Sequence, residues 1–304
     1  MGMKHHYSLR KIAAALSCIF IASVTFAGTS LTANAAATSI TRISGNTRYE
    51  TMGMVSRAAF LSAPPSKAAV VASGTDFPDA LAASSLAGHL NAPILLTDPK
   101  SLSNETANEL NRLDANAIFV IGGNKAVSHN VENEIRATHP SATITRLAGS
   151  TRFDTAHSIY NELATLGAKP QTAIISTGFN FADALSISPY SYMQSAPFFL
   201  SSQSGLDEAS LNTLRNFQTA IIVGGEQAVP TSVEQQLKSI GVSTVRIQGT
   251  TRYETSLEIG KFTLNNLSLD PSSVVYATGA NFPDALSGLS LIHISEPTRP
   301  ISIS

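Results

Sequence analysis

Short runs of consecutive hydrophobic residues recur along the chain, separated by longer stretches of mixed polarity. In the first half of the sequence, such runs lie at residues 69–72, 94–96 and 118–121. Apolar residues at consecutive positions are typical of a strand that is buried on both faces, as in a parallel sheet. We therefore expect a parallel sheet built from these three segments.

The stretches between the runs have the spacing of helices. In the middle of the chain Phe153, Ala156, Tyr160 and Leu163 follow one another at the intervals that place them along one face of a helix. Strands that alternate with helices require right-handed crossovers. The pattern predicts α/β modules of the Rossmann-like, doubly wound type, with mainly parallel sheets.

Three sequence blocks recur in the same order along the chain. The first block ends in G-x-T-R-[YF]-[ED]-T, the second contains F-[PA]-D-A-L, and the third contains G-G followed by A-V. The first block lies at residues 42–51, 146–155 and 246–255, the second at 73–81, 177–185 and 278–286, and the third at 120–127 and 223–229. A period of about 100 residues is the size of a domain, so the units are tandem domains and not the turns of a solenoid.

The repeats predict how the chain is divided. We expect a signal peptide at residues 1–35, repeats at 36–141 and 142–241, a truncated third repeat at 242–291, and an anomalous, disordered or artefactual tail at 292–304. In that tail Pro297 and Pro300 stand where the other copies continue into a strand and a helix, and proline disrupts both.

The first residues of the chain indicate secretion. Lys4, Arg10 and Lys11 precede an apolar stretch that runs to about residue 27, and small residues follow up to Ala35. This is the pattern of a signal peptide, with cleavage after Ala35. A membrane anchor is the alternative, but Ser, Thr and Gly interrupt the apolar stretch too early for a span. A lipoprotein linkage through Cys18 fits the sequence less well.

Composition excludes several classes of protein. The 304 residues are 43% hydrophobic and 13% charged, which is too apolar for a disordered chain. The net charge of −1 provides no basic field for nucleic acid or membrane phosphates. Cys18 is the only cysteine, and the sequence contains neither H-E-x-x-H nor G-x-S-x-G. We expect no catalytic residue, no metal site and no cofactor.

Acidic residues in the blocks have a structural interpretation. Thr47 and Glu50 have the spacing of a capping box, in which each side chain satisfies a backbone N–H group at the start of a helix. Asp79, Asp183 and Asp284 follow at the start of the next predicted helix in each copy, where a carboxylate interacts favourably with the helix dipole.

Arginines in the first block do not fit that interpretation. Arg48, Arg152 and Arg252 are predicted at the first position of a helix, where the dipole disfavours a cation by about 0.3–1 kcal/mol. An anionic partner would resolve the conflict. It could be an aspartate of the same or the next unit, in an inter-domain salt bridge, or an external carboxylate or phosphate. The G-G pairs could bind an anion through their backbone, or could simply form tight turns.

Together these blocks resemble the cell wall-binding repeat type 2 family of Gram-positive surface proteins, over residues 40–291. The resemblance implies Rossmann-like modules, usually three around a pseudo-threefold axis, that hold secreted proteins non-covalently on the wall. The implied partner is an anionic cell wall polysaccharide or teichoic-type polymer attached to peptidoglycan. Ligand-binding residues are then expected at Arg48, Arg152, Arg252, Asp79, Asp183 and Asp284. The second copy departs from the family pattern at Ala182, and the third lacks the I-L-L strand.

Three functions remain open at this point. The chain is expected to be a non-catalytic wall-binding module of a secreted, cell-surface protein. It could instead be the wall-binding part of an N-acetylmuramoyl-L-alanine amidase or protease whose catalytic domain lies outside this sequence. It could also be a structural component of a surface layer, in which the arginines join neighbouring domains. None of these interpretations requires nucleic acid or a membrane span after signal cleavage.

Overall fold

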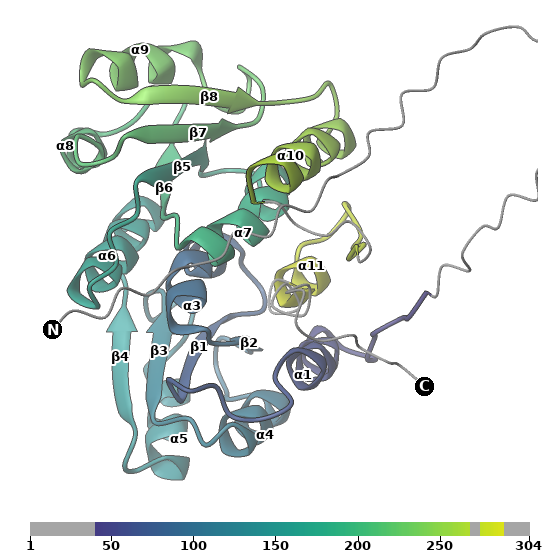
Figure 1. Ribbon diagram of the computed structural model, residues 1–304. Coiled ribbons are helices and arrows are strands. Elements are labelled where there is room, and N and C mark those ends of the chain that lie inside the picture. The colour runs from purple at the N-terminus through teal and green to yellow at the C-terminus, as the bar shows by residue number, and fades with distance from the viewer. Residues whose placement is uncertain (1–39, 268–273, 289–304) are drawn as a thin grey trace, which may run out of the picture. The chain divides into compact units, whose positions relative to one another are not determined.

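The computed structural model describes residues 40–267 and 274–288 (Figure 1). All the helices and strands below belong to one compact unit, Arg42–Ser304. The predicted signal peptide and the predicted tail at residues 292–304 lie outside the described residues.

The first sheet contains four parallel strands. They are β1 (Ala68–Ser73), β2 (Ile94–Thr97), β3 (Ala117–Ile121) and β4 (Thr143–Leu147), in the order β2-β1-β3-β4. Val70 on the central strand β1 lies opposite Ile94 on one side and Phe119 on the other. Every residue of β1 and β2 is buried, which confirms the strands predicted from consecutive apolar residues.

Helices connect these strands. They are α1 (Arg48–Ala59), α2 (Pro78–Ala82), α3 (Ser84–Leu90), α4 (Asn104–Arg112) and α5 (His129–Thr138). Because strands and helices alternate and all pairings are parallel, the predicted α/β class is confirmed.

The second sheet repeats the first. Its strands are β5 (Thr172–Thr177), β6 (Phe198–Ser201), β7 (Thr219–Val223) and β8 (Ser243–Ile247), in the order β6-β5-β7-β8. Its helices are α6 (Arg152–Thr165), α7 (Ala182–Gln194), α8 (Glu208–Leu214) and α9 (Thr231–Ser239). In the third copy the structure describes α10 (Arg252–Leu267) and α11 (Pro283–Gly288).

Each sheet is completed by a strand that starts the next sequence repeat. β4 lies after residue 141, where the second repeat is predicted to begin, yet it pairs with β3 of the first sheet. β8 pairs in the same way with β7, and its last two residues are the first two of the third copy of the first block. The G-x-T-R block therefore lies directly after the last strand of the preceding sheet.

Helices α3 and α7 make the closest contact between the first two copies. A Cβ atom on Gly88 would lie 1.8 Å from the carbonyl oxygen of Tyr192, so only glycine allows this approach. The hydroxyl group of Tyr192 donates a hydrogen bond to the carbonyl oxygen of Ala92 at 3.1 Å. The two copies therefore share a continuous interior, and one hydrophobic cluster contains residues of both.

The three copies meet at three phenylalanine rings. Phe77, Phe181 and Phe282 hold the same place in the three F-[PA]-D-A-L blocks, and their ring centroids lie 5.7, 5.8 and 5.9 Å apart. Around them α2 packs against α6, α7 against α10, and α11 against α1. Each copy therefore contacts the next in cyclic order, and the third returns to the first.

Candidate ligand-binding site at the repeat junctions

The recurring arginines begin helices, as predicted. Arg48, Arg152 and Arg252 are the first residues of α1, α6 and α10. Nη1 of each donates a hydrogen bond to a glycine carbonyl oxygen of the second block in the same copy: Gly74 at 2.5 Å, Gly178 at 2.5 Å and Gly279 at 2.6 Å. These arginines thus link the two blocks of one copy.

The three arginines bond with backbone carbonyl groups and not with a carboxylate, which the sequence had suggested as a partner. Across residues 40–267 and 274–288, none of the three guanidinium groups has a carboxylate oxygen within 4.0 Å. The backbone carbonyl group supplies the negative end of a dipole, which offsets part of the conflict with the helix terminus.

The glycine of the second block is needed for close packing. A Cβ atom on Gly74 would lie 2.6 Å from the ring of Tyr49, the residue that follows Arg48. The corresponding distance in the third copy, from Gly279 to the Tyr253 ring, is 2.9 Å. The arginine and the aromatic residue after it therefore both contact this glycine.

Threonine caps each of these helices. The Thr47 hydroxyl group accepts a hydrogen bond from the Glu50 N–H group at 3.1 Å, and Thr151 does the same for Asp154. The reciprocal bond is complete in the second copy, where the Asp154 carboxylate accepts from the Thr151 N–H group. In the first copy the longer Glu50 side chain accepts instead from Asn46, one residue before the cap. The predicted capping box is therefore correct in the second copy and shifted by one residue in the first.

Asp79 lies against the next copy. Its carboxyl group hydrogen-bonds with Thr155, and Arg152 is close enough to affect its charge. The pKa of Asp79 is raised from 3.8 to about 6, mainly by burial and also by the nearby charge of Asp76, while Thr155 and Arg152 act in the opposite direction. An aspartate of the first copy and an arginine of the second therefore belong to one junction.

Asp183 repeats this arrangement at the second junction. Burial raises the pKa of its carboxyl group, while the charge of Arg252 and a hydrogen bond with Thr255 lower it. At the third junction Asp284 is exposed and is the second residue of α11. α11 packs against α1, which begins at Arg48.

The G-G pairs accommodate these aspartates. Gly122 has φ +96°, and a Cβ atom there would lie 2.5 Å from Oδ2 of Asp79. Gly224 has φ +102° and the same relationship, at 2.6 Å, with Asp183. The first glycine of each pair is therefore required both by the turn and by a carboxylate of its own copy. The Asp79 and Asp183 side chains therefore occupy the position at each G-G turn where an external anion could have bound.

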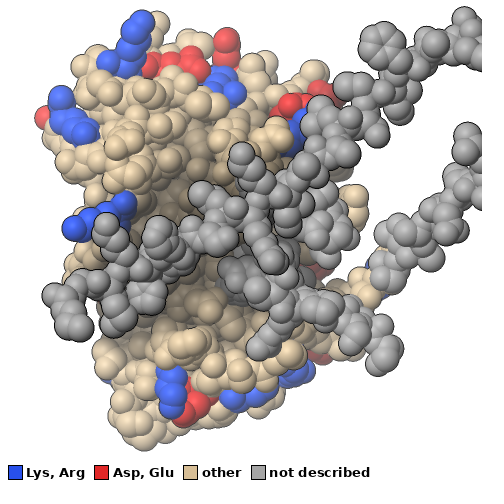
Figure 2. Space-filling model, viewed as in Figure 1, with Lys and Arg blue, Asp and Glu red and all other residues tan. Residues whose placement is uncertain are grey.

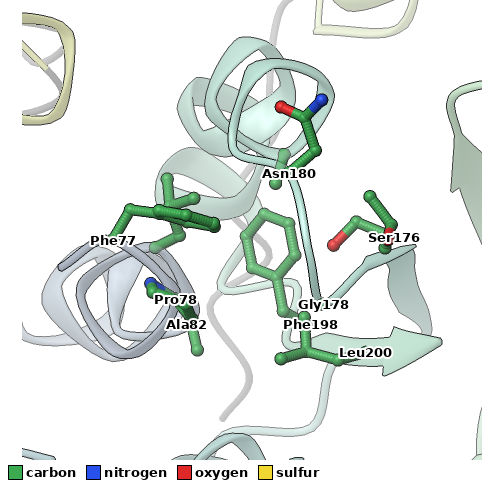
Figure 3. A pocket seen from close by; sticks show the side chains of 11 residues that line it. Phe77, Pro78, Ala82, Ser176, Gly178, Asn180, Phe198 and Leu200 are labelled. Carbon is green, nitrogen blue, oxygen red and sulfur yellow. The ribbon is translucent and has the colours of Figure 1, made fainter. Parts of the chain in front are cut away.

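The two junctions between neighbouring copies differ in how well they are filled. Between the first two copies a cavity of about 10 Å³ remains, closed by Phe77, Phe198 and Leu200 (Figure 3). Between the second and third copies the corresponding cavity measures about 220 Å³ and is lined by Phe181, Arg252 and other residues of both copies.

A second set of recurring arginines is structural. Nη1 of Arg146 donates hydrogen bonds to the carbonyl oxygens of Gly122 and Val127, at 2.7 and 2.9 Å, and Nε bonds with Glu132. Arg246 and Glu234 form the matching pair in the second sheet. These arginines support the G-G turns, and their recurrence in the sequence was a signal of that role.

Glu109 was missed by the sequence analysis. Its side chain is fully buried, and its carboxylate bonds with Arg57 at 2.9 Å and Arg112 at 2.6 Å. It occurs in one copy only and lies in a polar helix, so no repeated pattern marks it in the sequence.

One cluster contains the residue types of a hydrolytic triad but lacks its geometry. Nε2 of His157 lies 3.0 Å from Oγ of Ser210 and 3.7 Å from Asp207. A triad needs the carboxylate on the opposite ring nitrogen and an accessible nucleophile, whereas Ser210 is buried. The described residues contain no group of three potential metal ligands, and no helix in this part of the chain is long and apolar enough to cross a membrane.

A known family combines these features. The sequence profile described as Cell wall binding domain 2 (CWB2) matches residues 42–132, 146–234 and 246–297. The chain belongs to the CWB2 family. The family resemblance inferred from the repeated blocks is therefore confirmed, with three copies in tandem.

Relatives of this CWB2 chain include two proteins of Bacillus subtilis (strain 168). It is 30% identical over 285 residues to N-acetylmuramoyl-L-alanine amidase LytC, which covers 93% of this chain and 53% of the relative. It is 32% identical over 251 residues to an amidase enhancer, which covers 82% of this chain and 33% of the relative. The chain thus spans about half of one relative and a third of the other.

Solved structures share the CWB2 fold. Cwp8 from Clostridium difficile matches with a TM-score of 0.71 and 28% identity, over 83% of this chain and 43% of that protein. Cwp6 from the same organism matches with a TM-score of 0.70 at 23% identity, over 82% of this chain and 39% of Cwp6.

Proposed function

We propose that this CWB2 module binds an anionic polymer associated with peptidoglycan, without catalysis, and so anchors a secreted protein at the cell surface. The observation that carries the proposal is the arginine at the start of one helix in each copy. Within the described chain, each of these guanidinium groups has one hydrogen bond, made through Nη1. Because a guanidinium group has five N–H donors, Nε and Nη2 are available to an anion.

The position of these arginines favours an anionic ligand. The first turn of a helix presents unpaired N–H groups and the positive end of the dipole. A guanidinium group fixed there adds a full positive charge. A phosphate or carboxylate bound at this place would interact favourably with the N–H groups, the helix dipole and the guanidinium charge.

Binding is expected to be local and repeated. On the face seen in Figure 2, the described basic and acidic side chains lie in small mixed groups. With a net charge of −1, attraction to a polyanion has to come from short-range sites. Three such sites on one chain suit a polymer with repeating charges, because each engaged site raises the effective concentration at the next.

We further propose that Asp79, Asp183 and Asp284 adjust the charge at these sites. Each belongs to a helix that packs against the helix beginning with the next copy's arginine. An ionised aspartate there weakens the attraction for a polyanion, and a protonated one does not.

A pull-down with purified walls tests the arginines. The double variant Arg48→Ala, Arg152→Ala should lose at least tenfold in wall affinity. The double variant Arg136→Ala, Arg215→Ala removes the same charge elsewhere and should bind like the unaltered chain. Equal binding by all three proteins would remove the arginines from the proposal.

A second candidate rests on the relatives. Since one relative is named as an amidase and another as an amidase enhancer, this module could serve as the wall-binding part of such a protein. We then expect the chain itself to release no muropeptides from purified walls. Measurable release would contradict the non-catalytic proposal.

A further inference from the structure

Phe179 is an exposed aromatic side chain beside one of the recurring arginines. It is 61% exposed, whereas every other aromatic residue between positions 40 and 249 is buried or half-buried. A single exposed apolar side chain is ordinary on a protein surface, but this one lies at a site that recurs in every copy. Its neighbours therefore show what the ring can do.

The position of Phe179 carries a different side chain in each copy. It follows the glycine whose carbonyl oxygen accepts the arginine's hydrogen bond, and Thr75 and Ala280 take its place in the first and third copies. In each copy its N–H group donates to the hydroxyl group of a serine or threonine two residues earlier, at 3.2, 3.3 and 3.2 Å. The backbone is thus held in the same way three times, and only the second copy presents a ring there.

Arg152 and Phe153, the first two residues of α6, hold this ring in place. The guanidinium carbon of Arg152 lies 6.0 Å from the centroid of the Phe179 ring. The Phe153 ring meets it edge-to-face, with centroids 6.3 Å apart and an interplanar angle of 65°. A positive charge and an aromatic surface therefore lie side by side, and because both are fixed before a ligand arrives, binding orders few side chains.

A sugar ring that carries an anionic group matches this pair. One face of a pyranose ring presents C–H groups, which pack favourably against the negative face of an aromatic ring and leave water. In the part of the chain that the structure describes, Arg152 donates its one hydrogen bond through Nη1, so Nε and Nη2 can bind a phosphate or carboxylate of the same ligand. A polyol phosphate has no ring and can use only the arginine.

We propose that Phe179 determines specificity at the second site, by packing against a sugar ring whose anionic substituent binds to Arg152. This inference rests on the proposed function and narrows its ligand: the second copy prefers an anionic sugar to a polyol phosphate. The first and third copies have Thr75 and Ala280 at this position and lack the preference. The three sites of one chain are therefore not equivalent.

Nuclear magnetic resonance titration with two phosphate monoesters tests the preference. We suggest glucose 1-phosphate, which has a sugar ring, and glycerol 3-phosphate, which has none, each added to the full chain at the same pH. The backbone amide signals of residues 177–181 report on the second site. There the unaltered chain should bind glucose 1-phosphate at least threefold more tightly than glycerol 3-phosphate, and Phe179→Ala should bind the two equally.

Two further variants and a control locate the effect. Thr75→Phe places a ring in the first copy and should give the amide signals of residues 73–77 the same preference. Phe179→Trp enlarges the aromatic face and should increase the preference; since the sequence contains no tryptophan, its fluorescence reports on this position alone. Leu61→Ala removes a side chain of a residue that is 79% exposed and should bind both compounds like the unaltered chain.

Three results would overturn the inference. If Phe179→Ala weakens the binding of both compounds by the same factor, the ring only positions Arg152. If it weakens neither, or if neither compound shifts the signals of residues 177–181, the ring does not contact the ligand. The proposed function is tested apart from this, because Arg152→Ala should weaken both compounds and the wall pull-down does not depend on either. A failure of Phe179→Ala alone therefore leaves the proposed function untouched.

Discussion

The carboxyl group of Asp79, in the first repeat, lies within hydrogen-bonding reach of Thr155, in the second. Thr155 also accepts a hydrogen bond from the N–H group of Gly149 and so ties its own loop to α6. A single contact thus joins the F-P-D-A-L block of one copy to the G-x-T-R block of the next. The repeated residues of this chain therefore build the junctions between copies as well as the copies themselves.

The titration of Asp79 should make stability depend on pH. The pKa of Asp79 is about 6 in the folded protein against 3.8 for the ordinary group, so the folded state binds a proton more tightly than the unfolded chain. This contribution to stability is fully present below pH 3.8 and is lost as the pH rises through about 6. At pH 7.5, Asp79→Asn should therefore raise the free energy of unfolding by about 2–3 kcal/mol.

Urea unfolding at several pH values checks this prediction. The difference in unfolding free energy between Asp79→Asn and the unaltered chain should be largest above pH 6.5 and should shrink towards pH 4. A difference that does not change with pH would show that the pKa of Asp79 is not raised in the folded protein.

The same group should make wall binding depend on pH. As the pH rises through about 6, Asp79 gains a negative charge next to Arg152. We expect affinity for an anionic polymer to fall several-fold between pH 5 and pH 7.5, and the double variant Asp79→Asn, Asp183→Asn to show a flatter profile. Binding isotherms on purified walls measure both, and identical profiles for the two proteins would contradict the role proposed for the aspartates.

Gly88 should be intolerant of substitution. A Cβ atom there would lie 1.8 Å from the Tyr192 carbonyl oxygen, so Gly88→Ala has to move α3 away from α7. We expect a loss of about 2–3 kcal/mol, comparable to other overpacked interiors. Gly123→Ala is the matched control, because a Cβ atom at Gly123 would meet no atom within 4 Å. Thermal unfolding should separate the two variants by several degrees, and similar melting temperatures would be evidence against tight packing of these helices.

Glu109 should be one of the most sensitive charged residues of the first repeat. Its carboxylate is fully buried between two arginines, and its removal leaves their charges unpaired. Glu109→Ala should destabilise the protein by about 3 kcal/mol. Glu258→Ala breaks an exposed pair with Lys261 and should cost less than about 0.5 kcal/mol. Denaturant titration compares them, and equal effects would contradict the importance of burial.

Local features could be predicted from the sequence, because each depends on neighbouring residues. Consecutive apolar positions identified β1, β2 and β3, and the Thr47 spacing identified a helix cap. The arginines were placed correctly at the first position of their helices for the same reason.

Contacts between copies could not be predicted in this way. A tandem repeat shows what each unit contains but not which surface of its neighbour it meets, so the contact of Asp79 with Thr155 was not expected. The Phe77, Phe181 and Phe282 triangle depends on the same kind of contact, since three residues about 100 positions apart meet only when the copies close in cyclic order. The family resemblance implied that order, and the residues alone did not. Arg48 was expected to need an anionic group, and a neutral carbonyl oxygen of Gly74 partly meets that need.

The third hypothesis, a structural role of the arginines within a surface layer, makes a different prediction from wall binding. If Arg48, Arg152 and Arg252 only held the copies together, replacing them with alanine would lower the melting temperature and leave wall affinity unchanged. If they bind polymer, wall affinity should fall as well. Each replacement also removes one carbonyl hydrogen bond, worth about 1 kcal/mol of stability, and the fall in affinity should be larger than the unfolding caused by that loss would explain.

Wall binding before and after removal of the anionic polymers tests the central claim most directly. Purified walls should deplete the full chain from solution, and walls stripped of their anionic polymers by acid extraction should not. The Arg48→Ala, Arg152→Ala variant should show little difference between the two preparations. Equal depletion of the unaltered chain by intact and stripped walls would contradict the account.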